Sequence, residues 1–263
     1  MYTLASTDSV AGLLAFDFDG TLHDPPSGGV VNEQFFEAVE EARSRHGVHW
    51  GICTGRSLGH LTEGIVEGRF RFLPDFVVTR EREIFHPGRF GRWLPDEKWN
   101  RRCEREHHKL FRRTRKVLQK IREFVDQHTK ARWVDTSGDP AGIVASSVDE
   151  MDAILRFALA ELELCQDLSY ERNSIYLRFS HRAFNKGTAL SHLAKQKGVP
   201  AEAVLAVGDN SNDLSMLHRE VAERLGCPSN SIAEVKERVH GHGGVVAKSP
   251  GCHGVVEVMA AYL

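Results

Sequence analysis

Three short apolar segments constrain the fold most, because each ends in a cluster of polar, turn-forming residues. These segments are Val10–Phe16, His49–Cys53 and Ala203–Val207. A stretch with helical spacing of apolar residues, Asn32–Arg45, separates the first two. Short apolar strands that alternate with helices are typical of a parallel α/β sheet. Because ligands of such sheets bind beyond the carboxyl ends of the strands, we expect the three polar clusters to meet in space.

The first polar cluster lies in the string A-F-D-F-D-G-T-L, residues 15–22. Asp17 and Asp19 are two positions apart, and side chains at that spacing in an extended segment point to the same side. Two close carboxylates repel, which raises the pKa of one of them unless a cation lies between them. The pair therefore indicates either a shared proton or a Mg²⁺ ion, which prefers oxygen ligands. For a D-x-D pair alone, a strand that ends in an Asx turn is the alternative.

The full string resembles the first motif of the haloacid dehalogenase (HAD) superfamily of phosphohydrolases. The resemblance implies that Asp17 is a nucleophile toward phosphorus and that Asp19 is a general acid and base. A second string, G-D-N-S-N-D at residues 208–213, fits the family pattern G-D-x-x-N-D. The resemblance implies a Mg²⁺ site formed by Asp17, the backbone carbonyl of Asp19, Asp209 and Asp213, with Asp213 either a ligand or an orienting group. It also implies that Asn212 contacts the phosphoryl group.

Two weaker motifs complete the family's order along the chain. Thr54-Gly55-Arg56 resembles the second motif, and Lys186 lies in N-K-G-T-A-L, which resembles the third. The resemblance implies that Thr54, the Gly55 amide and Lys186 hold the phosphoryl group. Lys186 would also offset the negative charge of Asp17 and the phosphoryl oxygens. Alone, T-G-R is common in loops, and Lys186 could be one surface lysine among many.

The middle of the chain predicts a second domain. We expect helices at Glu104–His128 and Ser147–Leu164, and strands at Ala131–Val134, Gly142–Ser146 and Ser174–Phe179. Ser147 with Glu150 three positions later has the spacing of a capping box. This insert resembles the α/β cap of HAD subclass IIB. The expected division is a Rossmann-like core at 1–82 and 181–263, with the cap at 83–180.

One stretch departs from the family pattern. Sugar phosphatases of this branch usually show an Asn-Gly pair after the third core strand, whereas this chain has V-T-R-E-R-E at residues 78–83. The start of the cap is therefore expected to be charged, and the substrate contacts there are expected to differ. Arg132, Asn173 and Arg178 are further candidates for contacts between the cap and the leaving group.

Composition and charge limit the possible partners and location. The net charge of the 263-residue chain is −2, so no overall positive field attracts nucleic acid or an anionic membrane. The five cysteines form no C-x-x-C pair and are odd in number, which argues against a disulfide framework. No apolar run reaches the ~18 residues of a membrane span, and Met1–Gly12 does not resemble a signal peptide. We expect a cytoplasmic protein with neither a membrane nor a nucleic-acid partner.

The segment Lys98–Arg122 carries eleven Lys or Arg residues. We interpret it as the solvated face of an amphipathic helix, although an anionic substrate tail or a nucleic acid could bind there. The histidines of His240–Gly244 could chelate a transition metal, but without further ligands at a useful spacing we interpret the segment as a solvent loop. Cys53 lies inside a predicted strand, and we interpret it as a small buried apolar residue in preference to a nucleophile.

These observations predict a Mg²⁺-dependent phosphomonoesterase that hydrolyses a small phosphorylated metabolite, a sugar phosphate by family resemblance. A phosphotransferase or phosphomutase of the same superfamily is the nearest alternative. A nucleic-acid-binding module that uses the basic helix is the alternative outside enzymology. The sequence leaves the individual substrate and the oligomeric state open.

Overall fold

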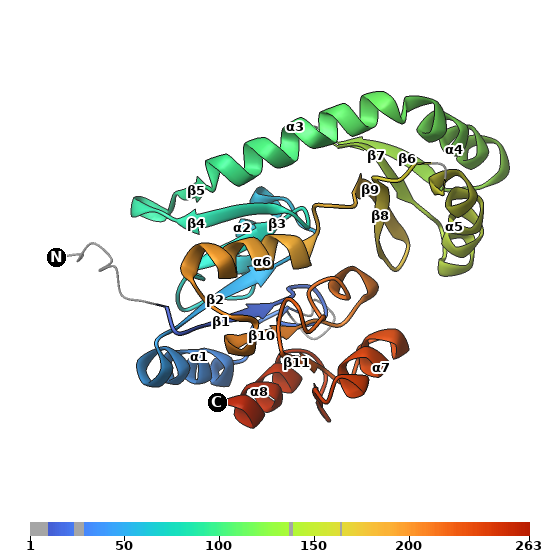
Figure 1. Ribbon diagram of the computed structural model, residues 1–263. Helices are drawn as coiled ribbons and strands as arrows, with labels where there is room; N and C mark the ends of the chain where they lie inside the picture. Colours follow the sequence, from blue (N-terminus) through green and yellow to red (C-terminus); the bar gives the residue numbers. More distant parts are fainter. Residues whose placement is uncertain (1–9, 24–28, 137–138, 164) are drawn as a thin grey trace. The chain divides into compact units, whose positions relative to one another are not determined.

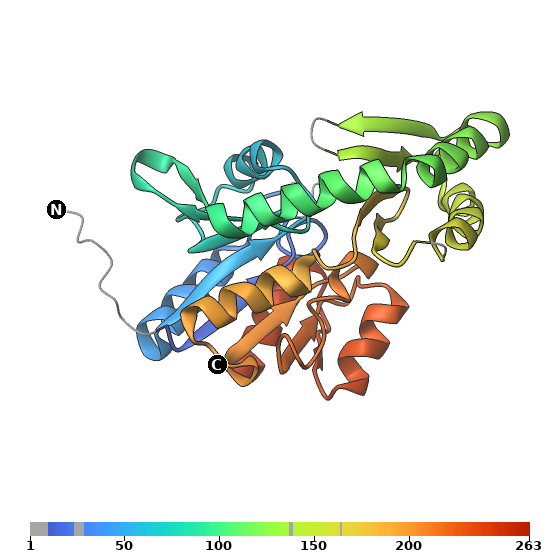
Figure 2. The same ribbon diagram turned by 45° about the horizontal axis from the view of Figure 1, so that its top comes forward.

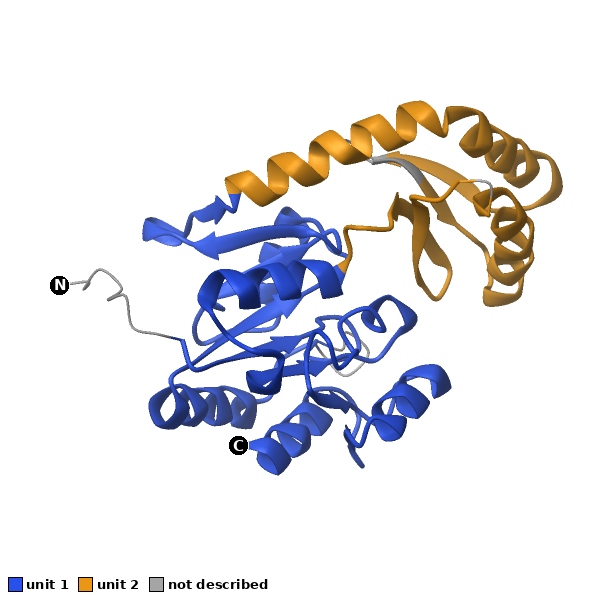
Figure 3. Ribbon diagram, viewed as in Figure 1, with its two compact units in different colours: residues 1–96, 186–263 blue, residues 97–185 orange. Residues whose placement is uncertain are grey.

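The computed structural model describes residues 10–23, 29–136, 139–163 and 165–263, and it divides into two compact units (Figure 3). The core comprises Met1–Asp96 and Lys186–Leu263, and the cap comprises Glu97–Asn185. Within the described ranges, we find no helix with the length and apolar character needed to cross a membrane.

The core is built on one eight-stranded sheet with the strand order β12-β11-β10-β1-β2-β3-β4-β5. Its strands are β1 (Gly12–Phe16), β2 (Val48–Cys53), β3 (Phe76–Thr79), β4 (Glu83–Pro87), β5 (Trp93–Pro95), β10 (Val204–Val207), β11 (Arg224–Cys227) and β12 (Val245–Val246). All neighbours from β12 to β3 pair in parallel, whereas β4 and β5 add an antiparallel edge. This arrangement confirms the predicted α/β class.

Helices cover both faces of the core sheet. They are α1 (Glu33–His46), α2 (Leu58–Glu67), α6 (Lys186–Lys197), α7 (Ala233–Gly241) and α8 (Gly251–Tyr262), with short 3₁₀ segments at Arg89–Gly91, Ala201–Ala203 and Ser211–Asp213. Helices α1 and α8 lie side by side against one face, and α6 lies on the other (Figures 1 and 2). Phe35 of α1 packs edge-on against Phe16 and Trp50 of the sheet, so the apolar face predicted for this helix forms part of the core.

The strand order brings the three polar clusters together. Strand β1 lies between β10 and β2, with Leu14 opposite both Leu205 and Trp50. All three strands run in the same direction, so the residues that follow them emerge at the same end of the sheet. The prediction that these clusters meet is therefore confirmed.

The cap has a four-stranded antiparallel sheet with the order β6-β7-β9-β8. Its elements are α3 (Glu97–Arg113), α4 (Arg115–His128), β6 (Arg132–Thr136), β7 (Asp139–Val144), α5 (Val148–Leu162), β8 (Leu168–Asn173) and β9 (Tyr176–His181). Buried side chains of all three helices and of the sheet form one apolar cluster, which includes Leu110, Ile121, Ile154 and Phe179. The cap therefore has a hydrophobic core of its own.

The helices of the cap differ in part from the prediction. The single helix expected at 104–128 begins earlier, at Glu97, and is broken at Thr114 into α3 and α4. The Thr114 hydroxyl donates to the carbonyl of Leu110 at 2.9 Å, a local bond that often bends helices. Ser147 caps α5 as predicted, by accepting from the amide of Glu150. The predicted end of that helix, Leu164, lies outside the described residues.

The boundary between the units also differs from the expected one. The prediction assigned residues 83–96 to the cap, but β4 and β5 continue the core sheet, with Val78 opposite Ile84. At the other boundary, β9 runs to His181 and the cap continues to Asn185. Strand β8 was not predicted, because its sequence L-S-Y-E-R-N carries little apolar character.

Candidate active site

The turn after β1 folds back onto the loop after β10. Asp17 follows β1, and its amide donates to the carbonyl of Val207 at 2.8 Å, which extends the pairing of the two strands. Gly20 has a φ of +81°, and a Cβ at this position would lie 2.6 Å from Oδ2 of Asp209. The hydroxyl of Thr21 donates to Oδ1 of Asp209 at 3.0 Å. Glycine is thus needed both for the turn and for the close approach of Asp209.

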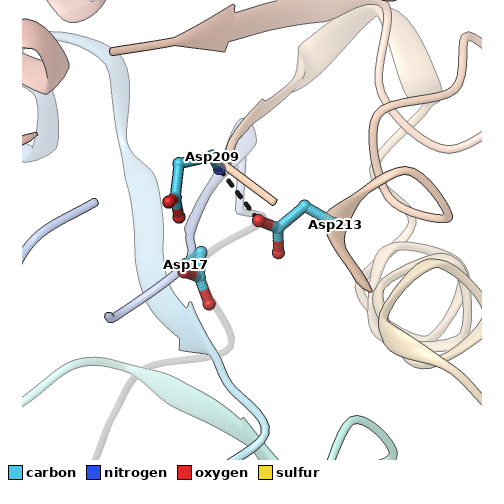
Figure 4. A group of neighbouring side chains, drawn as sticks. All are labelled: Asp17, Asp209 and Asp213. Carbon is cyan, nitrogen blue, oxygen red and sulfur yellow. Dashed lines mark hydrogen bonds between the residues drawn. The ribbon is translucent and has the colours of Figure 1, made fainter. Parts of the chain in front are cut away.

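Three buried carboxylates converge beyond these strand ends. Asp17, Asp209 and Asp213 each have one oxygen within 4.8 Å of the others (Figure 4). Oδ2 of Asp213 accepts from the amides of Asp209 and Asn210 at 2.9 and 3.0 Å; the dashed line in Figure 4 marks the first of these bonds. The structure therefore brings together the three predicted metal-binding side chains.

The electrostatics of this acidic group favour a bound cation. Burial, and then the nearby Asp213, raise the pKa of Asp17 well above its ordinary value. The same two causes raise the pKa of Asp209 to about 6. A divalent cation with oxygen ligands would offset this repulsion, so the residues fit Mg²⁺. Both oxygens of Asp213 already accept hydrogen bonds, which favours the orienting role for this residue.

Lys186, the first residue of α6, supplies a buried positive charge. Its side chain is 0% exposed, and its Nζ lies 2.6 Å from Oδ1 of Asp17 and 2.6 Å from Oδ1 of Asp213. Burial by itself lowers the pKa of Lys186, but the carboxylates of Asp17 and Asp213 outweigh it and raise this pKa well above its ordinary value. Lys186 is therefore an ammonium group held between two acids. A Cβ at Gly187 would collide with the carbonyl oxygen of Ser215, so glycine permits this approach of α6.

The loop after β2 holds Asp19 through an arginine. The hydroxyl of Thr54 accepts from the amide of Arg56 at 3.1 Å. The Arg56 side chain binds both oxygens of Asp19, with Nε 2.9 Å from Oδ2 and Nη2 2.6 Å from Oδ1. Its guanidinium also lies 4.8 Å from the ring centroid of Phe18. The Asp19 side chain is thus paired with Arg56 and does not belong to the acidic group, an arrangement that sequence reasoning missed.

The turn after β3 places another carboxylate in the site. Arg80 and Glu81 have φ values of +47° and +68°, left-handed conformations that cost about 1–3 kcal/mol for such residues. Their amides donate to the carbonyls of Arg56 and Thr54 at 2.8 and 3.0 Å, which fixes the turn against that loop. Glu81 is buried, and its Oε1 accepts from Nδ2 of Asn212 at 3.1 Å. The sequence analysis assigned no role to Glu81. The one hint in the sequence was that the stretch at residues 78–83 lacks the Asn-Gly pair usual in this branch and carries charged residues in its place.

The remaining sequence features receive structural explanations. Burial raises the pKa of the Cys53 thiol, which makes Cys53 a poor nucleophile. The basic side chains of the cap helices form many ion pairs with acids, which include Arg101–Glu97, Lys109–Glu106, Arg113–Asp167 and Lys120–Glu161. This pattern fits the interpretation as a solvated helix face. Arg132, Asn173 and Arg178 lie on β6, β8 and β9 of the cap sheet.

The chain is similar in sequence to known hydrolases. A family model for haloacid dehalogenase-like hydrolases matches residues 142–259. A candidate phosphatase of Streptococcus pyogenes serotype M6 is 24% identical over 247 residues, 86% of this chain and 90% of that protein. The 5-amino-6-(5-phospho-D-ribitylamino)uracil phosphatase of Bacillus subtilis is 25% identical over 222 residues, 78% of this chain and 79% of that protein.

Solved structures share the fold. The sucrose-phosphatase from Synechocystis sp. PCC6803, in complex with sucrose and phosphate, has a TM-score of 0.71 at 20% identity and covers 96% of this chain and 98% of that one. The HAD subclass IIB sugar phosphatase BT4131 has a TM-score of 0.67 at 15% identity, with 95% and 98% covered. The matched family segment includes Lys186, Asp209 and Asp213. Residues 142–259 of this chain, less than half of its length, are thus similar to the haloacid dehalogenase-like hydrolases.

Proposed function

We propose that the protein is a Mg²⁺-dependent phosphomonoesterase that hydrolyses a small phosphorylated metabolite through an aspartyl-phosphate intermediate. The observation that carries this proposal is the Lys186 ammonium, whose Nζ lies 2.6 Å from Oδ1 of Asp17. Asp17 in turn belongs to the group of three neighbouring carboxylates with Asp209 and Asp213. A buried carboxylate with an adjacent cation is a suitable nucleophile toward phosphorus. Phosphoryl transfer depends mainly on positioning and on charge stabilisation, and these residues supply both.

In the proposed reaction, a carboxylate oxygen of Asp17 bonds to phosphorus as the ester P–O bond breaks. The leaving alkoxide takes a proton from Asp19. Asp19 then accepts a proton from the water that attacks the phosphorus of the acyl phosphate, which releases inorganic phosphate and restores Asp17. Arg56 donates to both oxygens of Asp19 in the structure, so protonation of Asp19 weakens the bond to the oxygen that carries the proton.

The groups that hold the phosphoryl oxygens are Thr54, the Gly55 amide, Asn212 and Lys186. Thr54 accepts from the Arg56 amide, which leaves its hydroxyl proton to be donated. Mg²⁺, bound by Asp17, the Asp19 carbonyl and Asp209 with Asp213 behind them, would supply positive charge to the phosphoryl oxygens. The cation would also favour the ionised form of Asp17, whose pKa is raised in its absence.

A sugar phosphate is the proposed substrate class. This part of the proposal is supported by two proteins that share the fold and are sugar phosphatases: the sucrose-phosphatase from Synechocystis sp. PCC6803 and BT4131. We further propose a cytoplasmic location, without a membrane or nucleic-acid partner.

The test is the release of inorganic phosphate from a panel of sugar and polyol phosphates and an aryl phosphate, with Mg²⁺ and with EDTA. We expect metal-dependent release without any added acceptor, and its loss in Asp17→Asn. Asp126→Asn, at an exposed ion pair of α4, is the matched control and should behave as wild type. Release only in the presence of a sugar acceptor would indicate a phosphotransferase. Salt-sensitive RNA or DNA binding that survives Asp17→Asn would indicate the nucleic-acid-binding alternative.

A further inference from the structure

Glu81 occupies an unfavourable backbone conformation close to the phosphoryl-binding groups. Its φ of +68° lies in the left-handed region, where glycine has no steric cost and glutamate does. The side chain is nevertheless turned inward, with the residue only 5% exposed. Backbone strain of this kind persists where the surrounding structure holds it, often at functional sites.

The Glu81 carboxylate determines how the Asn212 side chain is oriented. Oε1 of Glu81 lies 3.1 Å from Nδ2 of Asn212. An ionised carboxylate only accepts hydrogen bonds, so the amide of Asn212 must present its nitrogen to Glu81. Within the described part of the chain, Oδ1 of Asn212 and Oε2 of Glu81 are both buried without a hydrogen-bond partner. The bond between the two side chains is therefore what fixes the amide.

A second contact places Glu81 beside the groups that are proposed to hold the phosphoryl oxygens. Its Oε2 lies 3.8 Å from Nζ of Lys186, too far for a hydrogen bond but close enough for charge attraction. A Cβ at Gly55 would lie 2.5 Å from Oε1 of Glu81. The carboxylate thus lies beside Gly55, Lys186 and Asn212, the groups proposed to hold the phosphoryl oxygens.

We propose that Glu81 is a positioning residue that sets the phosphate affinity of the site by holding the Asn212 amide in its binding orientation. This inference rests on the proposed function, because it takes the phosphoryl group as the ligand of Asn212. Without the carboxylate, the amide can rotate, and part of the binding free energy is lost in ordering it again. Glu81 acts through Asn212 and does not itself touch the ligand.

The first experiment measures the binding of inorganic phosphate by calorimetry in the presence of Mg²⁺. Glu81→Gly removes the carboxylate and relieves the strain, so the melting temperature should stay equal or rise. We expect the Kd for phosphate to rise at least about tenfold, with a parallel rise in KM and a smaller change in kcat. Arg80→Gly is the matched control, because it relieves backbone strain in the same turn and the Arg80 side chain contacts Glu83 and not Asn212. The Kd of this variant for phosphate should stay within about twofold of wild type.

A double-mutant cycle separates positioning from a merely structural role. If Glu81 acts through Asn212, then Glu81→Gly should change the Kd by less than about threefold in an Asn212→Ala background. A full tenfold effect in that background would overturn the proposal.

The outcomes distinguish this inference from the proposed function. If wild-type protein with Mg²⁺ does not bind phosphate, the proposed function fails, and the inference fails with it. If wild type binds and Glu81→Gly binds equally well, only the role of Glu81 is refuted. Tighter binding by Glu81→Gly would also refute it, because the carboxylate would then compete with phosphate.

Discussion

The Nζ of Lys186 lies 2.6 Å from Oδ1 of Asp17, although the two residues are 169 positions apart in the sequence. The same Nζ binds Asp213 at 2.6 Å, so one buried ammonium offsets two buried carboxylates. An unpaired buried charge is strongly destabilising. The Lys186 ammonium is therefore expected both to stabilise the folded core and to offset the negative charge of Asp17, the proposed nucleophile.

Lys186→Met should weaken both folding and activity. The substitution leaves the carboxylates of Asp17 and Asp213 without their cation, so we expect the free energy of unfolding at neutral pH to fall by about 3–5 kcal/mol. Phosphate release should fall by at least about 100-fold, because the charge near the phosphoryl oxygens is lost. Chemical denaturation and steady-state kinetics measure the two effects. Lys195→Met, at an exposed position of the same helix, should change neither; a stable and active Lys186→Met would contradict the proposed role.

Mg²⁺ should stabilise the protein more at neutral than at acidic pH. The pKa of Asp209 rises in the folded state from 3.8 to about 6, through burial and Asp213. Between these values the unfolded chain releases a proton that the folded protein keeps, so the metal-free protein loses stability as pH rises through this window. Mg²⁺ requires the ionised carboxylate and must displace that proton below about pH 6.

The measurement is the rise in melting temperature on adding Mg²⁺, compared at about pH 5 and about pH 7.5. The rise should be larger at the higher pH, and Asp209→Asn should abolish the difference. An equal rise at both values in wild type would argue against Asp209 as a ligand.

Arg56→Lys should lower turnover while phosphate binding stays intact. Arginine contacts both oxygens of Asp19 with a rigid fork, whereas lysine offers a single flexible charge. A poorly oriented Asp19 is a weaker general acid, so we expect kcat to fall at least about tenfold. The Kd for inorganic phosphate should stay within about twofold, because the Arg56 side chain is not among the proposed phosphate ligands. Arg45→Lys, at an exposed ion pair of α1, is the control. An unchanged kcat in Arg56→Lys would show that the two guanidinium contacts are not needed to orient Asp19.

Local patterns predicted the elements that carry a clear periodicity. The helix at 33–46 and the strands before Asp17, Thr54 and Asp209 lie within a few residues of their predicted ranges. The break at Thr114 was missed, because an uninterrupted apolar stripe continues across it while a single hydroxyl bends the backbone. Strands β4 and β5 were assigned to the cap, because their antiparallel pairing with the core sheet is a long-range contact.

The α/β class and the order of the polar clusters could be predicted from the sequence, and the family resemblance selected the acidic residues and Lys186 as site candidates. Which side chains pair with one another became visible only in the folded structure. The fold turned Asp19 toward Arg56 and brought Glu81 to Asn212, across 37 and 131 positions. Such pairs depend on strand register, on left-handed turns and on the burial of charge, which act only once distant segments have packed together. Local propensity and motif spacing do not encode these distances.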